Sequence, residues 1–97
     1  MKVFFVPQAQ LELSDAVAYY ELQYPGLGAR FKREVRASIQ RIIELPDAFP
    51  PAQKDVRKAF VRAFPYKILF AVESDHLLIV AVAHQHRDPD YWVDRAT

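Results

Sequence analysis

Basic, histidine and tyrosine side chains gather in the second half of this 97-residue chain, and their types suit the cleavage of a phosphodiester bond. Cleavage of RNA by its own 2′-hydroxyl needs a group that takes that proton, cations that stabilise charge on the scissile phosphate, and a donor for the leaving oxygen. An aromatic ring can also stack on a base. The candidate catalytic residues are Lys58, Lys67, His84, His86, Arg87 and Tyr91, and the candidate RNA- or partner-binding residues are Arg57, Arg62 and Trp92.

These residues also have structural interpretations, and the sequence leaves both open. A basic stretch such as residues 54–67 can be the solvated edge of a sheet, because charged side chains protect edge strands from pairing. His84 and His86 are either acid–base groups or strand-end residues that hydrogen-bond to the backbone or to the aspartate-rich tail. Trp92 is expected to pack on the second face of the sheet, since tryptophan is usually largely buried.

The composition excludes several classes of site. There is no cysteine, which rules out disulfides and thiolate metal sites, and no clear third ligand accompanies His84 and His86. Gly26 and Gly28 are the only glycines, so glycine-rich phosphate loops are absent. The 13 basic and 12 acidic residues nearly cancel, so a nucleic-acid contact would have to come from a local cluster. We therefore expect no metal and no cofactor.

No apolar run approaches the roughly 18 residues of a membrane span. The apolar run at residues 3–6 is also too short for a signal peptide. We therefore expect a cytoplasmic protein with no membrane partner.

The first half of the chain predicts a strand and two helices. Residues 3–6 are β-branched and aromatic and stop at Pro7, which is typical of a strand. Residues 8–24 and residues 27–45 then show apolar residues at spacings of three and four, with a short Pro-Gly turn between them. The two helices should therefore pack as a hairpin. Their apolar stripes are Leu13, Ala16, Val17, Tyr20 and Tyr24 in the first helix, and Leu27, Phe31, Val35, Ile39 and Ile42 in the second.

The second half predicts a proline-rich loop at residues 46–51 and then three strands, at residues 56–62, 66–73 and 77–84. The tight turn between the last two makes them an antiparallel hairpin. The whole chain, residues 1–97, is then a single α+β domain with the order βααβββ, in which a helix hairpin packs on a small antiparallel sheet.

Strand alternation sorts the side chains of this hairpin onto two faces. If Glu73 pairs with His76, Lys67 lies opposite Val82, and Lys67 and His84 point the same way. One face is wholly apolar and should take the helices. The other face needs cover, from the C-terminal tail or from a partner, over its apolar residues Leu69, Leu78 and Val80.

Three stretches in a particular order also carry a family resemblance. They are residues 16–25 (AVAYYELQYP), residues 62–70 (RAFPYKILF) and residues 80–92 (VAVAHQHRDPDYW). Together they resemble the RelE/ParE superfamily of type II toxin–antitoxin toxins, especially its plasmid-stabilisation proteins. The resemblance implies a toxin that inhibits growth, a cognate antitoxin that binds it in a hetero-oligomer, and one of two targets. RelE-like members are ribosome-dependent mRNA endonucleases, and ParE-like members poison DNA gyrase.

Matched residue by residue, the nuclease pattern of that superfamily is partly present. Lys58 falls at a catalytic Lys position, Lys67 replaces a catalytic Arg, and Tyr91 matches a functional Tyr. Phe60 and Gln85 stand where the nuclease branch has basic residues. The leading hypothesis is the toxin of a type II toxin–antitoxin pair, and ribosome-dependent mRNA cleavage is one activity open to it. The alternatives are a non-catalytic gyrase inhibitor and a decayed toxin that only binds its antitoxin.

Overall fold

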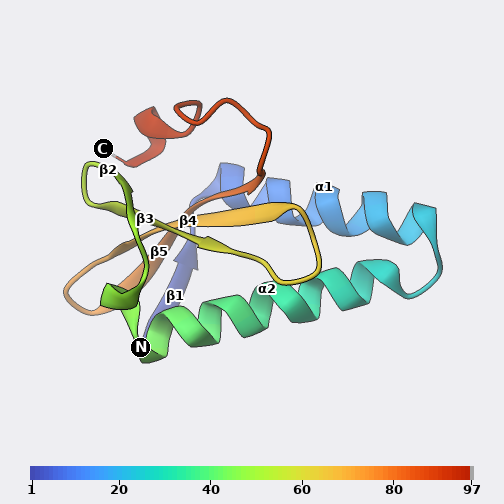
Figure 1. The fold of residues 1–97 in the computed structure, drawn as a ribbon, viewed down its shortest axis with the longest axis horizontal. Helices are drawn as coiled ribbons and strands as arrows, with labels where there is room; N and C mark the ends of the chain where they lie inside the picture. The colour runs from blue at the N-terminus through green and yellow to red at the C-terminus, as the bar shows by residue number, and fades with distance from the viewer. Residues whose placement is uncertain (97) are drawn as a thin grey trace.

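The computed structural model describes residues 1–96, in which two helices cover one face of a five-stranded sheet (Figure 1). The expected α+β class and the order βααβββ are confirmed, with one additional short strand. The elements in chain order are β1 (Lys2–Phe5), α1 (Pro7–Gln23), α2 (Leu27–Glu44), a 3-10 turn (Pro46–Ala48), β2 (Pro51–Gln53), β3 (Val56–Phe60), β4 (Tyr66–Val72), β5 (His76–His84) and a second 3-10 turn (Val93–Ala96).

Both helices lie within one residue of their expected bounds. Pro7 begins α1, where its missing N–H costs nothing. Tyr24 was expected in the buried stripe, but it is 70% exposed. The chain has already turned extended there, with φ −162° and ψ 133°, because the residue before a proline is disfavoured in the helical conformation. The stripe of α2 is buried at Phe31, Val35 and Ile42.

The turn between the helices is closed by the Glu21 side chain. Its carboxylate oxygens accept hydrogen bonds from the backbone N–H of Gly26, at 2.9 and 3.1 Å, and of Gly28, at 3.1 Å. Two of the N–H groups that the start of α2 leaves without helical partners are satisfied in this way. Gly26 has φ +89°, a conformation that favours glycine.

The strand order is β1-β5-β4-β3-β2, and the sheet is mixed. β3, β4 and β5 are antiparallel, as expected, and the additional strand β2 is antiparallel to β3. Against the expectation of a wholly antiparallel sheet, β1 lies parallel to β5 with Phe4 opposite Leu78. Parallel neighbours need a long connection, and the chain from α1 to β4 supplies one. The additional strand β2 lies at the far edge, the place in a sheet where a proline such as Pro51 is tolerated.

A β-bulge in β5 changes the expected hairpin register. Pairing from Val72–Leu77 to Phe70–Ile79 follows the prediction, but the next pair is Leu69 with Ala81, which leaves Val80 as the extra residue. A bulge places two residues opposite one and turns the following side chains to the other face. Beyond it, the prediction is wrong by one position: Lys67 lies opposite Ala83 instead of Val82.

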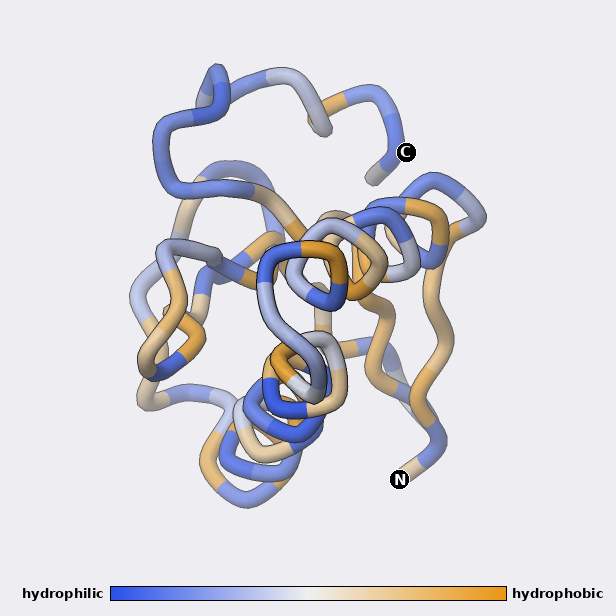
Figure 2. Tube along the Cα trace, turned by 90° about the vertical axis from the view of Figure 1, so that its right-hand side faces the viewer, coloured by the Kyte–Doolittle hydropathy of each residue, from blue (hydrophilic) through white to orange (hydrophobic). Residues whose placement is uncertain are grey.

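The bulge divides the sheet side chains between two cores. The core under the helices contains Ile68, Phe70 and Val82, and the core on the opposite face contains Leu69, Val80 and Ala81. Of the two covers expected for the second face, the structure provides the C-terminal segment, whose Trp92 is 1% exposed. In Figure 2 this segment is a mostly hydrophilic arch interrupted by a short apolar stretch.

Across residues 1–96, neither helix combines the length and the apolar character that a membrane crossing requires.

Substitution of Gly28 tests how closely the two helices approach each other. A Cβ at this position would lie 2.6 Å from the Val17 carbonyl oxygen and 3.1 Å from Glu21. We expect Gly28→Ala to lower the free energy of unfolding by about 1–3 kcal/mol, the usual cost of overpacking. Without that clash, alanine would stabilise a helix relative to glycine by about 1 kcal/mol.

Urea denaturation of Gly28→Ala and of Ala29→Gly would check this prediction. Ala29 is exposed in the same helical turn, so its variant measures the intrinsic difference between glycine and alanine there. A Gly28→Ala protein as stable as the parent would contradict the close approach.

Candidate functional site

The structure separates the predicted site residues into two groups, and the first lies on the sheet face that the C-terminal segment covers. Lys58 of β3 pairs with Leu69 of β4, and Phe60 pairs with Lys67, so strand alternation places both lysines on the Leu69 side. A cavity of about 110 Å³ has Lys58, Lys67 and Trp92 in its wall, together with Asp90. The sequence therefore correctly placed Lys58 and Lys67 on one face.

The second group, His84, His86 and Arg87, lies at the end of β5. The ring of His84 makes an edge contact with Tyr66 at 5.4 Å between centroids, and the ring of His86 lies 5.3 Å from that of His84. The backbone N–H of His86 donates to His84 Nδ1 at 3.2 Å. His84 and Arg87 line an open cleft of about 310 Å³ together with Glu12 and other residues of α1.

The expectation that Lys67 and His84 share a face is therefore wrong. The bulge at Val80 shifts the register by one residue, so His84 pairs with Tyr66 and lies on the helix side. Lys67 stays on the opposite side.

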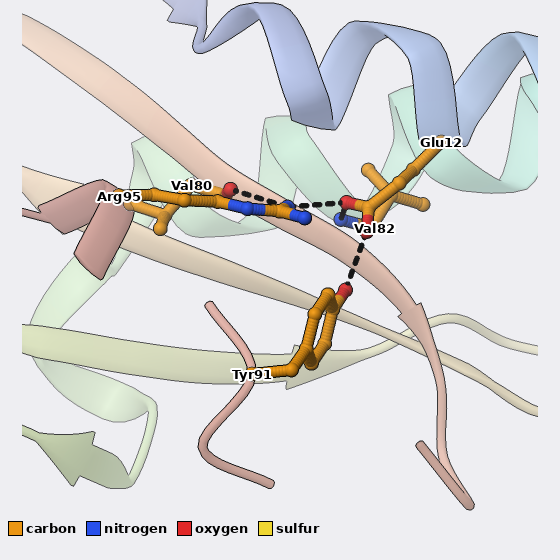
Figure 3. A network of polar contacts seen from close by, with 5 residues as sticks. All are labelled: Glu12, Val80, Val82, Tyr91 and Arg95. Atoms are coloured by element: carbon orange, nitrogen blue, oxygen red, sulfur yellow. Dashed lines mark hydrogen bonds and ion pairs between the residues drawn. The ribbon is translucent and has the colours of Figure 1, made fainter. Parts of the chain in front are cut away.

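Beside the second group, Glu12 of α1 is the centre of a hydrogen-bond network (Figure 3). Its Oε2 accepts from the Tyr91 hydroxyl at 2.7 Å, and its Oε1 accepts from Arg95 Nη1 at 2.8 Å and from the backbone N–H of Val82 at 3.1 Å. The carboxylate is only 17% exposed. One side chain thus joins α1, β5 and the C-terminal segment.

The same network satisfies the backbone groups on the edge of β5 that β1 does not cover. The strand β1 ends where the Val6 N–H donates to the Ile79 carbonyl oxygen at 3.0 Å. The next backbone groups along that edge are the Val80 carbonyl and the Val82 N–H. They bond to Arg95 Nη1, at 3.4 Å, and to Glu12. Side chains therefore replace the strand that β1 is too short to provide.

Tyr91 is held as a structural anchor. Burial raises the pKa of its hydroxyl well above the ordinary value, and the hydrogen bond to Glu12 and the charge of Glu12 raise it further, against the opposing charges of Arg95 and Arg87. The guanidinium carbons of Arg87 and Arg95 lie 4.0 and 4.8 Å from the ring centroid. The hydroxyl proton is directed to Glu12, and the two guanidinium groups lie over the ring.

The remaining candidates have separate surroundings. Arg57 donates to the Phe49 carbonyl oxygen at 2.6 Å, on the opposite side of the sheet from Lys58, and Arg62 is exposed after β3. Trp92 is buried, so its expected role as an RNA or partner contact is wrong, and its expected packing on the sheet is confirmed. Within residues 1–96, no three His, Asp or Glu side chains form a group that could hold a metal ion.

Sequence reasoning missed Glu12 and Arg95. Glu12 lies beside the apolar stripe of its helix and looks like a solvated residue, because its partners are 70 to 83 residues away along the chain. No spacing rule relates positions so distant. The one available signal is that α1 contains acidic residues and no lysine or arginine, which leaves Glu12 without a partner on its own helix.

Comparison with known proteins decides the family. A family model described as the ParE toxin of the type II toxin–antitoxin system parDE matches residues 3–89. The chain belongs to the ParE toxin family. The expected superfamily and the expected role as the toxin of a type II toxin–antitoxin system are thus confirmed. Membership in this family implies a protein antitoxin as the partner of this toxin.

Individual relatives agree with this assignment. Toxin ParE2 of Mycobacterium tuberculosis, from strains CDC 1551 and H37Rv, is 29% identical over 80 residues, which span 81% of this chain and 76% of the relative. A solved structure, the chromosomal ParDE toxin–antitoxin system from P. aeruginosa, superposes with a TM-score of 0.74 over 87% of this chain and 95% of the other, at 12% identity. At that identity the superposition supports the fold alone.

Glu12 is the position at which to test the network. We expect Glu12→Ala to lower the free energy of unfolding by about 2–3 kcal/mol, because it leaves the Val82 N–H, the Tyr91 hydroxyl and the Arg95 guanidinium without their acceptor. The matched control is Asp15→Ala, an exposed carboxylate one turn later on α1, which should change stability by about 0.5 kcal/mol or less.

Chemical denaturation monitored by Trp92 fluorescence would measure both variants, since the indole lies under the segment that Glu12 holds. Equal stability of the Glu12→Ala and Asp15→Ala proteins would contradict the anchoring role.

Proposed function

We propose that this toxin acts in the cytoplasm by binding and inhibiting DNA gyrase, and that it cleaves no nucleic acid itself. The observation that carries the proposal is the separation of the candidate catalytic groups. Lys58 and Lys67 lie on one side of the sheet and His84 on the other, so they do not surround one reacting phosphate.

The state of Tyr91 supports the same proposal. General acid catalysis needs a donor whose proton is available to the leaving oxygen. The Tyr91 proton is engaged by Glu12, and the raised pKa of the hydroxyl makes its release harder still. Phe60 and Gln85, at positions where the nuclease branch is basic, offer no charge to the phosphate. A toxin that works by binding requires none of these groups to be reactive.

A supercoiling assay tests the target. Purified toxin, added to gyrase and relaxed plasmid, should abolish supercoiling at saturating toxin, because binding alone is sufficient for inhibition. In parallel, cell-free translation with mapping of the mRNA ends should show intact messages. Unaffected gyrase together with new mRNA ends inside translated codons would replace the proposal with the endonuclease hypothesis. Unaffected gyrase and intact mRNA would favour the decayed toxin.

We further propose that the antitoxin occupies a groove formed by β1, α1 and α2. The second sheet face, for which a partner was one of the two expected covers, is filled by Trp92. The groove has a volume of about 520 Å³, and its lining residues include Val3, Phe5, Leu13, Val35 and Ile39. It is therefore an open apolar surface that no segment of residues 1–96 fills.

The charge around this groove favours an acidic occupant. Lys32 and Arg36 lie among the residues that line it. The whole of α2 carries five basic residues, Arg30, Lys32, Arg33, Arg36 and Arg41, against two acidic ones, Glu34 and Glu44. An amphipathic helix of the antitoxin, apolar on one side and acidic along its flanks, would match both features.

Charge reversal in the groove tests this docking site. We expect Arg36→Glu to weaken antitoxin binding about 10- to 100-fold, since a like charge facing an acidic helix is strongly unfavourable. Arg33→Glu makes the same change on the same helix, at an exposed residue outside the groove lining, and should bind normally. Calorimetry with the cognate antitoxin would measure both. Equal affinities would place the antitoxin elsewhere.

A further inference from the structure

An exposed phenyl ring lies among cations on the sheet face beside the C-terminal segment. Phe60 of β3 is 56% exposed. Lys67 pairs with it across to β4, and Lys58 lies two residues before it on the same strand. Arg62 lies in the turn two residues after Phe60 and is exposed. We call these four residues the Phe60 surface: Lys58, Phe60, Arg62 and Lys67.

The cations of the Phe60 surface are available to a ligand. None of the three takes part in an ion pair with another residue of the described range 1–96. The carboxylate of Asp90 shares a cavity wall with the two lysines and accepts a hydrogen bond from Gln53 at 2.7 Å. By contrast, the neighbouring Arg57 is bonded to a backbone carbonyl on the other side of the sheet.

The ring gives the surface a second property that a purely basic patch lacks. Phe60 ends β3, and Ala59, its neighbour on the strand, points to the opposite face and is buried in the helix-side core. A flat exposed ring flanked by cations is complementary to a nucleotide, because a base stacks on the ring while phosphates meet the ammonium and guanidinium groups. Bases of an intact duplex are stacked on both sides, so the ring favours a single strand.

We propose that the Phe60 surface binds single-stranded DNA, with one base stacked on Phe60 and the adjacent phosphates on Lys58, Lys67 and Arg62. The choice of DNA rests on the proposed function, since gyrase is an enzyme that opens DNA. Binding involves no bond cleavage. Because stacking is available to every base, we expect little sequence preference.

Fluorescence anisotropy with a labelled mixed-sequence DNA oligonucleotide tests the surface without gyrase. The parent protein should bind with an affinity that falls with salt, with a log–log slope of about −2 for three phosphate contacts on a single strand. Phe60→Ala should weaken binding about 5- to 150-fold, the range for loss of one base–aromatic stack. Lys67→Gln should reduce the magnitude of the slope by about 0.7.

Phe4→Ala is the matched control. Phe4 is a 50% exposed phenylalanine on β1, at the opposite edge of the sheet, and is not among the groove residues. Its substitution should leave DNA affinity unchanged, and thermal melting would verify that both variants fold.

Three results would overturn the proposal: no DNA binding at low salt, equal affinities of Phe60→Ala and Phe4→Ala, or tighter binding of the parent protein to RNA of the same sequence or to polyglutamate. If the toxin inhibits gyrase but does not bind DNA, only the proposed role of the Phe60 surface is rejected. If the toxin binds DNA but leaves supercoiling unaffected, only gyrase as the proposed target is rejected.

Discussion

The backbone edge of β5 beyond the end of β1 is the constraint on which the rest of the structure depends. β5 is an inner strand of nine residues, whereas its neighbour β1 has four residues, and their pairing stops at the hydrogen bond of the Val6 N–H. Beyond that point the Val80 carbonyl and the Val82 N–H need partners, because an unpaired buried backbone group is costly. The ion pair of Glu12 and Arg95 supplies both. The same ion pair holds the C-terminal segment in place, so Trp92 can fill the second core.

The bulge at Val80 has a functional consequence as well as a structural one. It directs Val82 into the helix-side core and Ala81 into the Trp92 core, which permits both faces of one strand to be packed. It also places His84 on the side away from Lys67. One inserted residue therefore separates groups that an unbulged strand would have aligned. This separation is the basis on which we assign binding, rather than catalysis, to the surface around the lysines.

The two recognition surfaces that we propose lie on opposite sides of the sheet. The groove along α2 is apolar with basic residues in its lining, and it lies on the helix side. The Phe60 surface lies on the side of the C-terminal segment. An occupant of the groove leaves the Phe60 surface uncovered. The antitoxin would then neutralise the toxin in one of two ways. Either the target also needs the groove face, or the bulk of the bound antitoxin blocks the approach of the target.

The sequence by itself determined the class of fold, both helices, the three longer antiparallel strands and the family, because these depend on local periodicity and on short ordered stretches. The stripe through Phe31, Val35 and Ile42 specified the buried face of α2 from its spacing alone. Only the tertiary structure decided the parallel placement of β1, the bulge at Val80 and the role of Glu12. A bulge depends on how two strands pack between two cores, and Glu12 depends on Tyr91 and Arg95, which are far along the chain. Contacts between distant segments have no period in the sequence, so their chemistry became visible only once the chain was folded.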